Sequence, residues 1–340
     1  MPAERTEITE VVTGLATLGS ATLDEALTSQ PAQLVNVGSD VWSRLTGLRA
    51  AGEYAAEFQA AWANGRALLT SPDALAGRHP RIVEWKGNQR VPGEDPVPAD
   101  LRIDHVYLVS CKYLSKILVN ASPVSLFDHA LRRAPEATSP DWYLTAAADA
   151  YQELYDTVRR ELPGDLGLPP FVADLSREHR ATLREHLRGD WSSSTALVAR
   201  KFAAEVARVS AARWREQLAR KRDREQMLWR LLRIANAPYF VLGASAGRTL
   251  RLRIATPWDW KQRYDLRSFE VWGDEAGQPT VRWQASIRDN ETDSDVPVDG
   301  HVEVRWSHGR FAKPPEAKVY LDTLHHRVPG YFTLPGGEPL

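Results

Sequence analysis

Hydrophobic positions along the chain first separate helical stretches from strands. Residues 1 to about 72 place large apolar side chains such as Trp42, Leu45 and Leu48 at helical spacing, which predicts amphipathic helices. Residues 73–98 are rich in proline and glycine, so regular structure is interrupted there. One short segment inside that stretch, RIVEWKG, fits either a helical turn or a brief strand.

Residues 99–119 give the clearest strand pattern, because polar and apolar positions alternate and β-branched and aromatic types dominate. Helical spacing returns from about 122 to 236, and residues 238–334 alternate with period two between turn residues. The pattern predicts an α+β protein in three consecutive regions. These are a helical N-terminus with a small α/β core (1–135), a basic helical middle (136–236) and a C-terminal antiparallel β-rich module (237–340).

Composition narrows the class of protein. Of the 340 residues 43% are hydrophobic and 26% are charged, which is ordinary for a globular chain with a sizeable core. A single cysteine, Cys111, excludes an internal disulfide framework and a cysteine-based zinc site. The opening MPAERTEITEVV has no signal-peptide layout, and no apolar run reaches the roughly 20 residues of a membrane span. We therefore expect a cytoplasmic protein with no membrane contact.

The candidate catalytic residues lie in the stretch DLRIDHVYLVSCKY, residues 100–113. In a strand Ser110 and Lys112 share one face, and Cys111 points to the other. A lysine at the end of an apolar strand can position and polarise a water that attacks a phosphodiester beside a metal ion. The backbone carbonyl of Cys111 can also ligate a hard cation. A thiol nucleophile at Cys111 is the less favoured interpretation, because its parity predicts a buried structural side chain.

Asp100 followed by Ser110-Cys111-Lys112 resembles the motif of the PD-(D/E)XK nuclease superfamily, with serine at the usually acidic third position. The resemblance covers about residues 80–130. It implies a restriction-endonuclease-like α/β core with helical additions, and a Mg²⁺- or Mn²⁺-dependent endonuclease that hydrolyses DNA in restriction or antiviral defence. Asp100 would hold the metal, Lys112 would position the water, and Ser110 would support the network.

The turn between the two strands decides which aspartate faces Ser110. Asp104 is six residues from Ser110, roughly 20 Å along a straight strand, which is too far to share an ion. A two-residue turn would pair Asp100 with Val109, on the wrong face. A three-residue turn pairs Asp100 with Ser110 instead, so this longer turn is the prediction.

A second carboxylate must complete the metal site, since serine replaces the acidic residue. Glu84 is the preferred candidate, because it lies just upstream across a Pro/Gly-rich loop long enough to fold it back, and its neighbours Val83 and Trp85 can pack on the core. Asp128 is the alternative. Glu84 forming only a surface ion pair with Arg81 or Lys86 is the competing interpretation.

Basic and polar residues elsewhere suggest contacts with phosphates. Lys116 and Asn120 follow the motif directly, and Arg220, Lys221 and Arg222 lie in the densest basic segment. The basic segment can equally be a solvated amphipathic helix. The C-terminal strands interleave arginine with tryptophan, which serves either packing or nucleic-acid contact.

These observations predict a Mg²⁺-dependent deoxyribonuclease whose partner is DNA and which forms a homodimer if both duplex strands are cut. Two alternatives remain open: a catalytically inactive nucleic-acid-binding module, and a structural subunit of a larger defence complex. The recognition sequence and the choice of DNA over RNA stay open too.

Overall fold

The structure is a computed structural model of the chain. It describes residues 2–87, 99–113, 117–131, 141–164, 166–245, 248–274 and 277–338. The architecture is mixed α and β, as the sequence predicts, with one mixed sheet and one antiparallel sheet. In the described part of the chain, every helix is too short or too polar to cross a membrane.

The chain forms two compact units rather than consecutive blocks. The first unit combines Met1–Ser115, Arg233–Tyr264 and Leu324–Leu340, and the second combines Lys116–Leu232 with Asp265–Thr323. The division differs from the three consecutive regions expected from the sequence. The reason is long-range strand pairing, which local patterns do not reveal.

The first unit contains a seven-stranded sheet in the order β1-β2-β3-β4-β6-β7-β12. Pairing is parallel for β1 with β2 and for β4 with β6, and antiparallel elsewhere. The short RIVEWKG segment supplies β2, so it is a strand. The strands are β1 (Leu34–Val35), β2 (Val83–Trp85), β3 (Leu101–Ile103), β4 (Tyr107–Tyr113), β6 (Tyr239–Ser245), β7 (Arg248–Ile254) and β12 (Tyr331–Thr333).

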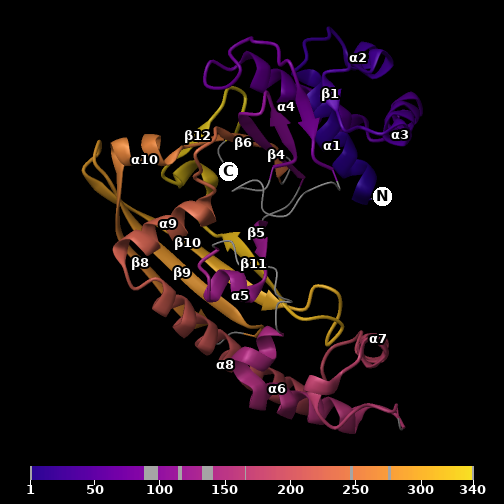
Figure 1. Ribbon diagram of the computed structural model, residues 1–340, viewed down its shortest axis with the longest axis vertical. Coiled ribbons are helices and arrows are strands. Elements are labelled where there is room, and N and C mark those ends of the chain that lie inside the picture. Colours follow the sequence, from indigo (N-terminus) through magenta and orange to yellow (C-terminus); the bar gives the residue numbers. More distant parts are fainter. Residues whose placement is uncertain are drawn as a thin grey trace. The chain divides into compact units, whose positions relative to one another are not determined.

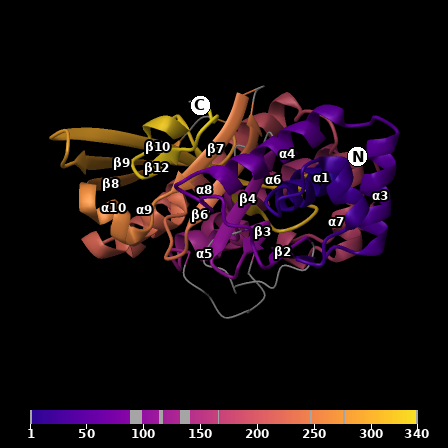
Figure 2. The same cartoon turned by 90° about the horizontal axis from the view of Figure 1, so that it is seen from above.

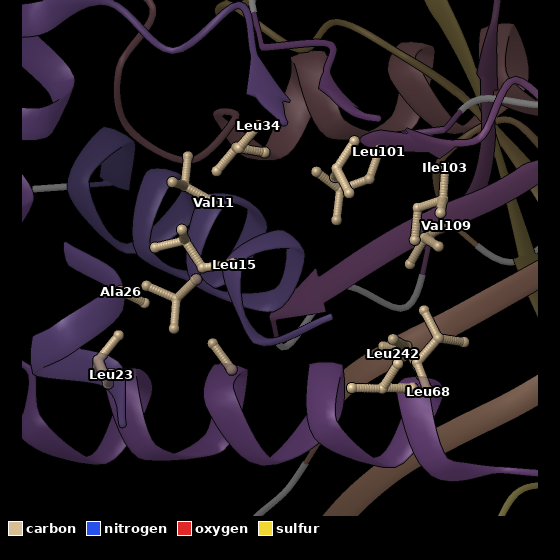
Figure 3. Packing of buried hydrophobic residues seen from close by; sticks show 14 of the residues in the cluster. Val11, Leu15, Leu23, Ala26, Leu34, Leu68, Leu101, Ile103, Val109 and Leu242 are labelled. Carbon is tan, nitrogen blue, oxygen red and sulfur yellow. The ribbon is translucent and has the colours of Figure 1, made fainter. Parts of the chain in front are cut away.

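Helices cover one face of this sheet, and the core of the first unit lies between them and the strands. Figure 3 shows side chains such as Val11, Leu15, Leu68, Val109 and Leu242 meeting there, and all of them are almost fully buried. The helices α1 and α4 lie side by side in both views (Figures 1 and 2). The helices of this unit are α1 (Pro2–Ala16), α2 (Leu23–Ser29), α3 (Ser39–Ala50), α4 (Ala55–Thr70), α10 (Pro257–Arg263) and the 3₁₀ turn η2 (His325–Arg327).

A glycine allows the close approach of α1 and α4. A Cβ atom at Gly65 would lie 2.2 Å from the carbonyl oxygen of Thr13 and 2.6 Å from the Cβ of Ala16. Only glycine fits at this crossing without moving a backbone. The helix pair that backs the sheet is therefore tightly packed.

The second unit contains a five-stranded antiparallel sheet in the order β5-β11-β10-β9-β8. Buried and exposed positions alternate along β8, β9 and β10, which fits a sheet covered on one face. The C-terminal strands predicted from the sequence are thus present, but β5 joins their sheet and β6, β7 and β12 belong to the first unit. The strands are β5 (Ile117–Ala121), β8 (Tyr264–Asp274), β9 (Thr280–Asp289), β10 (Ser294–Arg305) and β11 (Glu316–Leu321).

Two long helices, α6 and α8, run alongside one another in this unit (Figure 1). Between helices and strands, Tyr143, Tyr151, Phe202, Trp306 and Phe311 form one aromatic cluster with ring centroids 4.8–6.2 Å apart. The helices are α5 (Pro123–Phe127), α6 (Trp142–Glu161), η1 (Val172–Asp174), α7 (Arg177–His186), α8 (Ser193–Gln217) and α9 (Lys221–Leu232).

Candidate active site on the β3–β4 hairpin

The turn between β3 and β4 is the three-residue turn that the sequence predicts. The register pairs Leu101 with Val109 and Ile103 with Tyr107, leaving Asp104, His105 and Val106 outside the ladder. Asp104 and His105 have φ values of 48° and 59°, a left-handed conformation that tight hairpin turns require.

Asp104 has a structural role in that turn. Its Oδ1 accepts hydrogen bonds from the backbone N–H groups of Arg81 (2.8 Å) and Ile82 (3.1 Å). These bonds tie the start of β2 to the hairpin. Asp104 is therefore engaged at the turn, in agreement with the argument against it as a metal ligand.

Asp100 lies across from Ser110, as predicted. Its backbone N–H donates to the carbonyl of Val109 (2.8 Å), which extends the ladder by one residue beyond β3. Its Oδ2 accepts from the Ser110 hydroxyl (3.2 Å) and from the Cys111 backbone N–H (2.7 Å). Both Asp100 and Ser110 are buried, with 6% and 2% of their surface exposed. The carboxylate is thus fixed by its partner strand.

The two residues after Ser110 continue β4 in parallel register with β6, Cys111 with Leu242 and Lys112 with Gly243. Cys111 packs against the apolar core, on the opposite face from Asp100, as the alternation predicts. The structure describes the backbone of Lys112, whereas its side chain lies outside the description. The role of Lys112 and that of the Cys111 carbonyl remain predictions.

Glu84 lies on the same face of the sheet as Asp100, but a neighbouring arginine already binds its carboxylate. β2 pairs with β3 so that Glu84 is opposite Arg102. The Arg102 guanidinium donates to both carboxylate oxygens, at 2.5 and 2.8 Å, and His105 Nδ1 lies 3.2 Å away. Glu84 therefore forms an ion pair, as the competing interpretation has it, and the partner is Arg102 on the neighbouring strand, where that interpretation named Arg81 or Lys86.

The pKa of Glu84 reflects this pairing. The hydrogen bonds from Arg102 hold the pKa of the carboxyl below its usual range, partial burial works in the opposite direction, and the charges of Arg102, Lys86 and His105 lower it further. Glu84 is consequently ionised at neutral pH, as a metal ligand must be.

The spacing between Glu84 and Asp100 follows from the register. Because Glu84 is opposite Arg102, and the N–H of Lys86 donates to the Asp100 carbonyl (2.9 Å), the two acidic residues are diagonal neighbours on paired strands. Diagonal neighbours lie about 7–8 Å apart, within reach of long side chains. Glu84 can turn toward Asp100 only if it releases Arg102.

Asp128, the alternative second ligand, caps the end of α5 in the second unit. Its two carboxylate oxygens accept from Arg213 at 2.7 and 2.8 Å, and the guanidinium of Arg213 also lies over the ring of Trp142. This geometry gives Asp128 a role in joining α5 to α8.

The residues predicted to contact nucleic acid lie on different elements of the fold. Asn120 is exposed on β5, and Arg220, Lys221 and Arg222 are exposed at the start of α9. Lys116 lies outside the described residues. All of the described ones belong to the second unit.

Sequence reasoning missed Arg102 as the partner of Glu84. The signal was present in the alternation of LRI, because Leu101 and Ile103 face the core and Arg102 must share the face of Asp100. The register of β2 against β3, which places Arg102 opposite Glu84, could not be predicted from the sequence. Among the described residues, no three histidine, cysteine or acidic side chains are close enough together to hold a metal ion.

Comparison of the chain with protein-family models, with curated proteins and with solved structures found no match. The geometry of the hairpin and the resemblance of its motif are therefore the basis for a functional proposal.

Proposed function

We propose that this protein is a metal-dependent nuclease that hydrolyses phosphodiester bonds in DNA, with the β3–β4 hairpin as its active site. The observation that supports it is the hydrogen-bonded pair of Asp100 with Ser110, at the register a D-x9-S-x-K motif requires for one shared site. Support also comes from the mixed α and β architecture of the first unit, in which helices pack against one face of a mixed sheet.

The oxygen ligands on offer suit Mg²⁺ or Mn²⁺ in kind, although Glu84 is bound by Arg102 and Asp100 accepts two hydrogen bonds. Mg²⁺ is commonly bound through one or two carboxylates with water and substrate oxygens completing the shell. Asp100 would be the first carboxylate, Glu84 the second after exchanging Arg102 for the ion, and the Cys111 carbonyl a third oxygen. When bound, such an ion supplies charge neutralisation at the scissile phosphate.

The protein's own groups then have separate tasks. Ser110 and the Cys111 N–H keep Asp100 in one orientation. Lys112, two residues further along β4, would position the attacking water. Arg102, once it leaves Glu84, would be available to a phosphate oxygen, for which its planar guanidinium is well suited.

The pairing of Glu84 with Arg102 also favours a second candidate, a nucleic-acid-binding module without catalysis. In that case the ion pair is permanent and Asp100 serves only to join β3 to β4. The two candidates differ in whether purified protein cuts DNA.

The deciding experiment is plasmid nicking by the purified protein with and without Mg²⁺ or Mn²⁺, comparing the wild type with Asp100→Asn. We expect cleavage that requires metal and falls by at least about 100-fold in the variant, since a ligand is lost. Asp73→Asn, the same change at an exposed position of the first unit, is the control. Metal-independent nicking, or nicking by Asp100→Asn at the wild-type rate, would overturn the assignment. No nicking of plasmid, single-stranded DNA or RNA would favour the binding module.

A further inference from the structure

The second unit contains a cavity of about 1480 Å³ that the hairpin chemistry does not use. It is lined by α7, the segment that follows it, the first half of α8, two residues of α6, the 277–279 segment before β9, and residues 304–310 at and after the end of β10. Pockets for single small molecules usually measure about 300–1,000 Å³. The cavity therefore has room for more than one small ligand group.

Positive charge dominates its lining. Five arginines border the cavity, against one acidic residue, Glu185. They come from distant parts of the sequence and are Arg184, Arg188, Arg200, Arg305 and Arg310.

Three of these arginines are available to a ligand. Arg184, Arg188 and Arg200 are exposed, and none of them forms an ion pair with any residue that the structure describes. Arg305, in contrast, pairs with Glu303 at 2.9 Å. Guanidinium groups without a carboxylate partner favour phosphate, whose oxygens match their geometry.

Aromatic side chains form another part of the wall. Trp191 borders the cavity, and the guanidinium of Arg310 lies over its ring, 3.7 Å from the centroid, while donating to the Gly189 carbonyl (2.6 Å). Trp306 also borders the cavity and is held by Tyr143 and Phe311, with centroids 4.9 and 5.0 Å away. Flat rings beside guanidinium groups suit nucleotides, because bases stack on aromatic rings while phosphates bind arginine.

We propose that this cavity binds a short single-stranded stretch of nucleic acid, with Arg184, Arg188 and Arg200 on its phosphates and Trp191 against a base. A half-open cavity lined from several elements admits unpaired nucleotides, whereas bases within a duplex are stacked and out of reach. The inference goes beyond the nuclease proposal and does not require the hairpin to be active.

The test is fluorescence anisotropy with a labelled 12-nucleotide thymidine oligonucleotide in EDTA, where metal-dependent cleavage cannot occur. We compare the wild type with the triple variant Arg184→Ala/Arg188→Ala/Arg200→Ala. The control triple, Arg177→Ala/Arg215→Ala/Arg267→Ala, removes the same charge from exposed positions of the same unit outside the cavity. We expect at least tenfold weaker binding for the cavity triple and less than about threefold for the control.

The salt dependence sharpens this comparison. Each phosphate contact on single strands contributes about 0.7 to the slope of log affinity against log salt, so the cavity triple should lose roughly 2 units. Equal losses in both triples, or no binding by the wild type, would overturn the proposal. If the cavity triple is unfolded by circular dichroism, the single variant Arg200→Ala gives the same comparison against Arg215→Ala.

Competition by unlabelled oligonucleotides and nucleotides identifies the ligand of the cavity. An abasic oligonucleotide of equal length should compete at least fivefold less well, and Trp191→Ala should remove that preference. Equal competition by the abasic chain would rule out the base contact, and equal competition by a 12-base-pair duplex would rule out the single-strand assignment. If thymidine monophosphate displaces the probe as tightly as the oligonucleotide does, the ligand is a free nucleotide and the proposal is overturned. If the monophosphate displaces it only weakly, the result supports a nucleic-acid strand as the ligand.

Discussion

The two units differ in how their charged side chains are satisfied. In the first unit, Glu84 is bound by Arg102, and Asp100 accepts hydrogen bonds from Ser110 and a backbone N–H. In the second unit, Arg184, Arg188 and Arg200 line a cavity and form no ion pair with any described residue. Paired groups are held in place and must exchange partners to act, whereas unpaired cations attract an anion directly. The first unit therefore holds its candidate site residues in defined positions, whereas the second unit offers the stronger electrostatic attraction to an anion.

The largest expected effect is on the rate of DNA cleavage, and it tests whether the two units have separate functions. Lys112→Ala should reduce metal-dependent cleavage by about 100- to 1,000-fold, because a contact to the attacking water is lost in the transition state. Binding of the thymidine oligonucleotide in EDTA should stay within about twofold of the wild type. Lys201→Ala, at an exposed position on α8, is the control. A Lys112→Ala protein that cuts at the normal rate contradicts the assigned role.

The next effect concerns stability. Gly65→Ala should lower the free energy of unfolding by about 1–3 kcal/mol, because the added methyl group overlaps the backbone of α1. Gly47→Ala is the control: it lies exposed in α3, where an added Cβ meets no described atom within 4 Å, and should gain about 0.5–1 kcal/mol.

Thermal melting of the two glycine variants measures both effects. In Gly65→Ala we also expect cleavage to be lost at a lower temperature than oligonucleotide binding, because only the first unit is affected. Loss of both at the same temperature would mean that the two units unfold together.

A smaller effect is expected at the start of α9. Substituting Arg220, Lys221 and Arg222 by alanine should weaken duplex binding a few-fold and reduce its salt slope by about 0.9 for each phosphate contact removed. The measurement is anisotropy with a labelled duplex across a salt series. Unchanged affinity and slope would make this segment a solvated helix surface.

The smallest effect is the pH dependence of the Glu84–Arg102 pair. Arg102 lowers the pKa of Glu84 in the folded protein, so the pair stabilises the fold above the unfolded-state pKa of about 4.3 and this stabilisation is lost as pH falls through the lower folded pKa. An ion pair of this kind contributes up to about 1 kcal/mol.

Melting temperatures of the wild type and Glu84→Gln at pH 3–7 test this pair. The wild type should be the more stable at pH 6, and the difference should shrink below pH 4.5. In an Arg102→Gln background the Glu84 substitution should have little effect at any pH. A constant difference in both backgrounds would show that the pair contributes nothing.

The sequence predicted the hairpin well because the residues that determine it are close to one another along the chain. Alternation around Ser110 and the turn residues Asp104 and His105 determined the face and the register, and the structure confirms that Asp100 lies opposite Ser110. The type of most helices and strands followed from periodicity for the same reason.

The remaining features depend on contacts between distant residues. Arg102 binds Glu84 across 18 positions, and the cavity joins Arg184 to Arg310 across more than a hundred. The two units also could not be read from local pattern, since β4 pairs with β6 and β5 pairs with β11. No spacing rule relates such positions before the fold is known.

The parallel pairing of β4 with β6 has a consequence for synthesis on the ribosome. Residues 107–113 must wait for residues 239–245 before this ladder can form, which at 5–20 residues per second is roughly 6–25 s. During that interval one edge of β4, including Ser110 and Lys112, has no β6 beside it. Nascent chains halted before residue 239 should therefore bind chaperones or aggregate more than chains halted after residue 264.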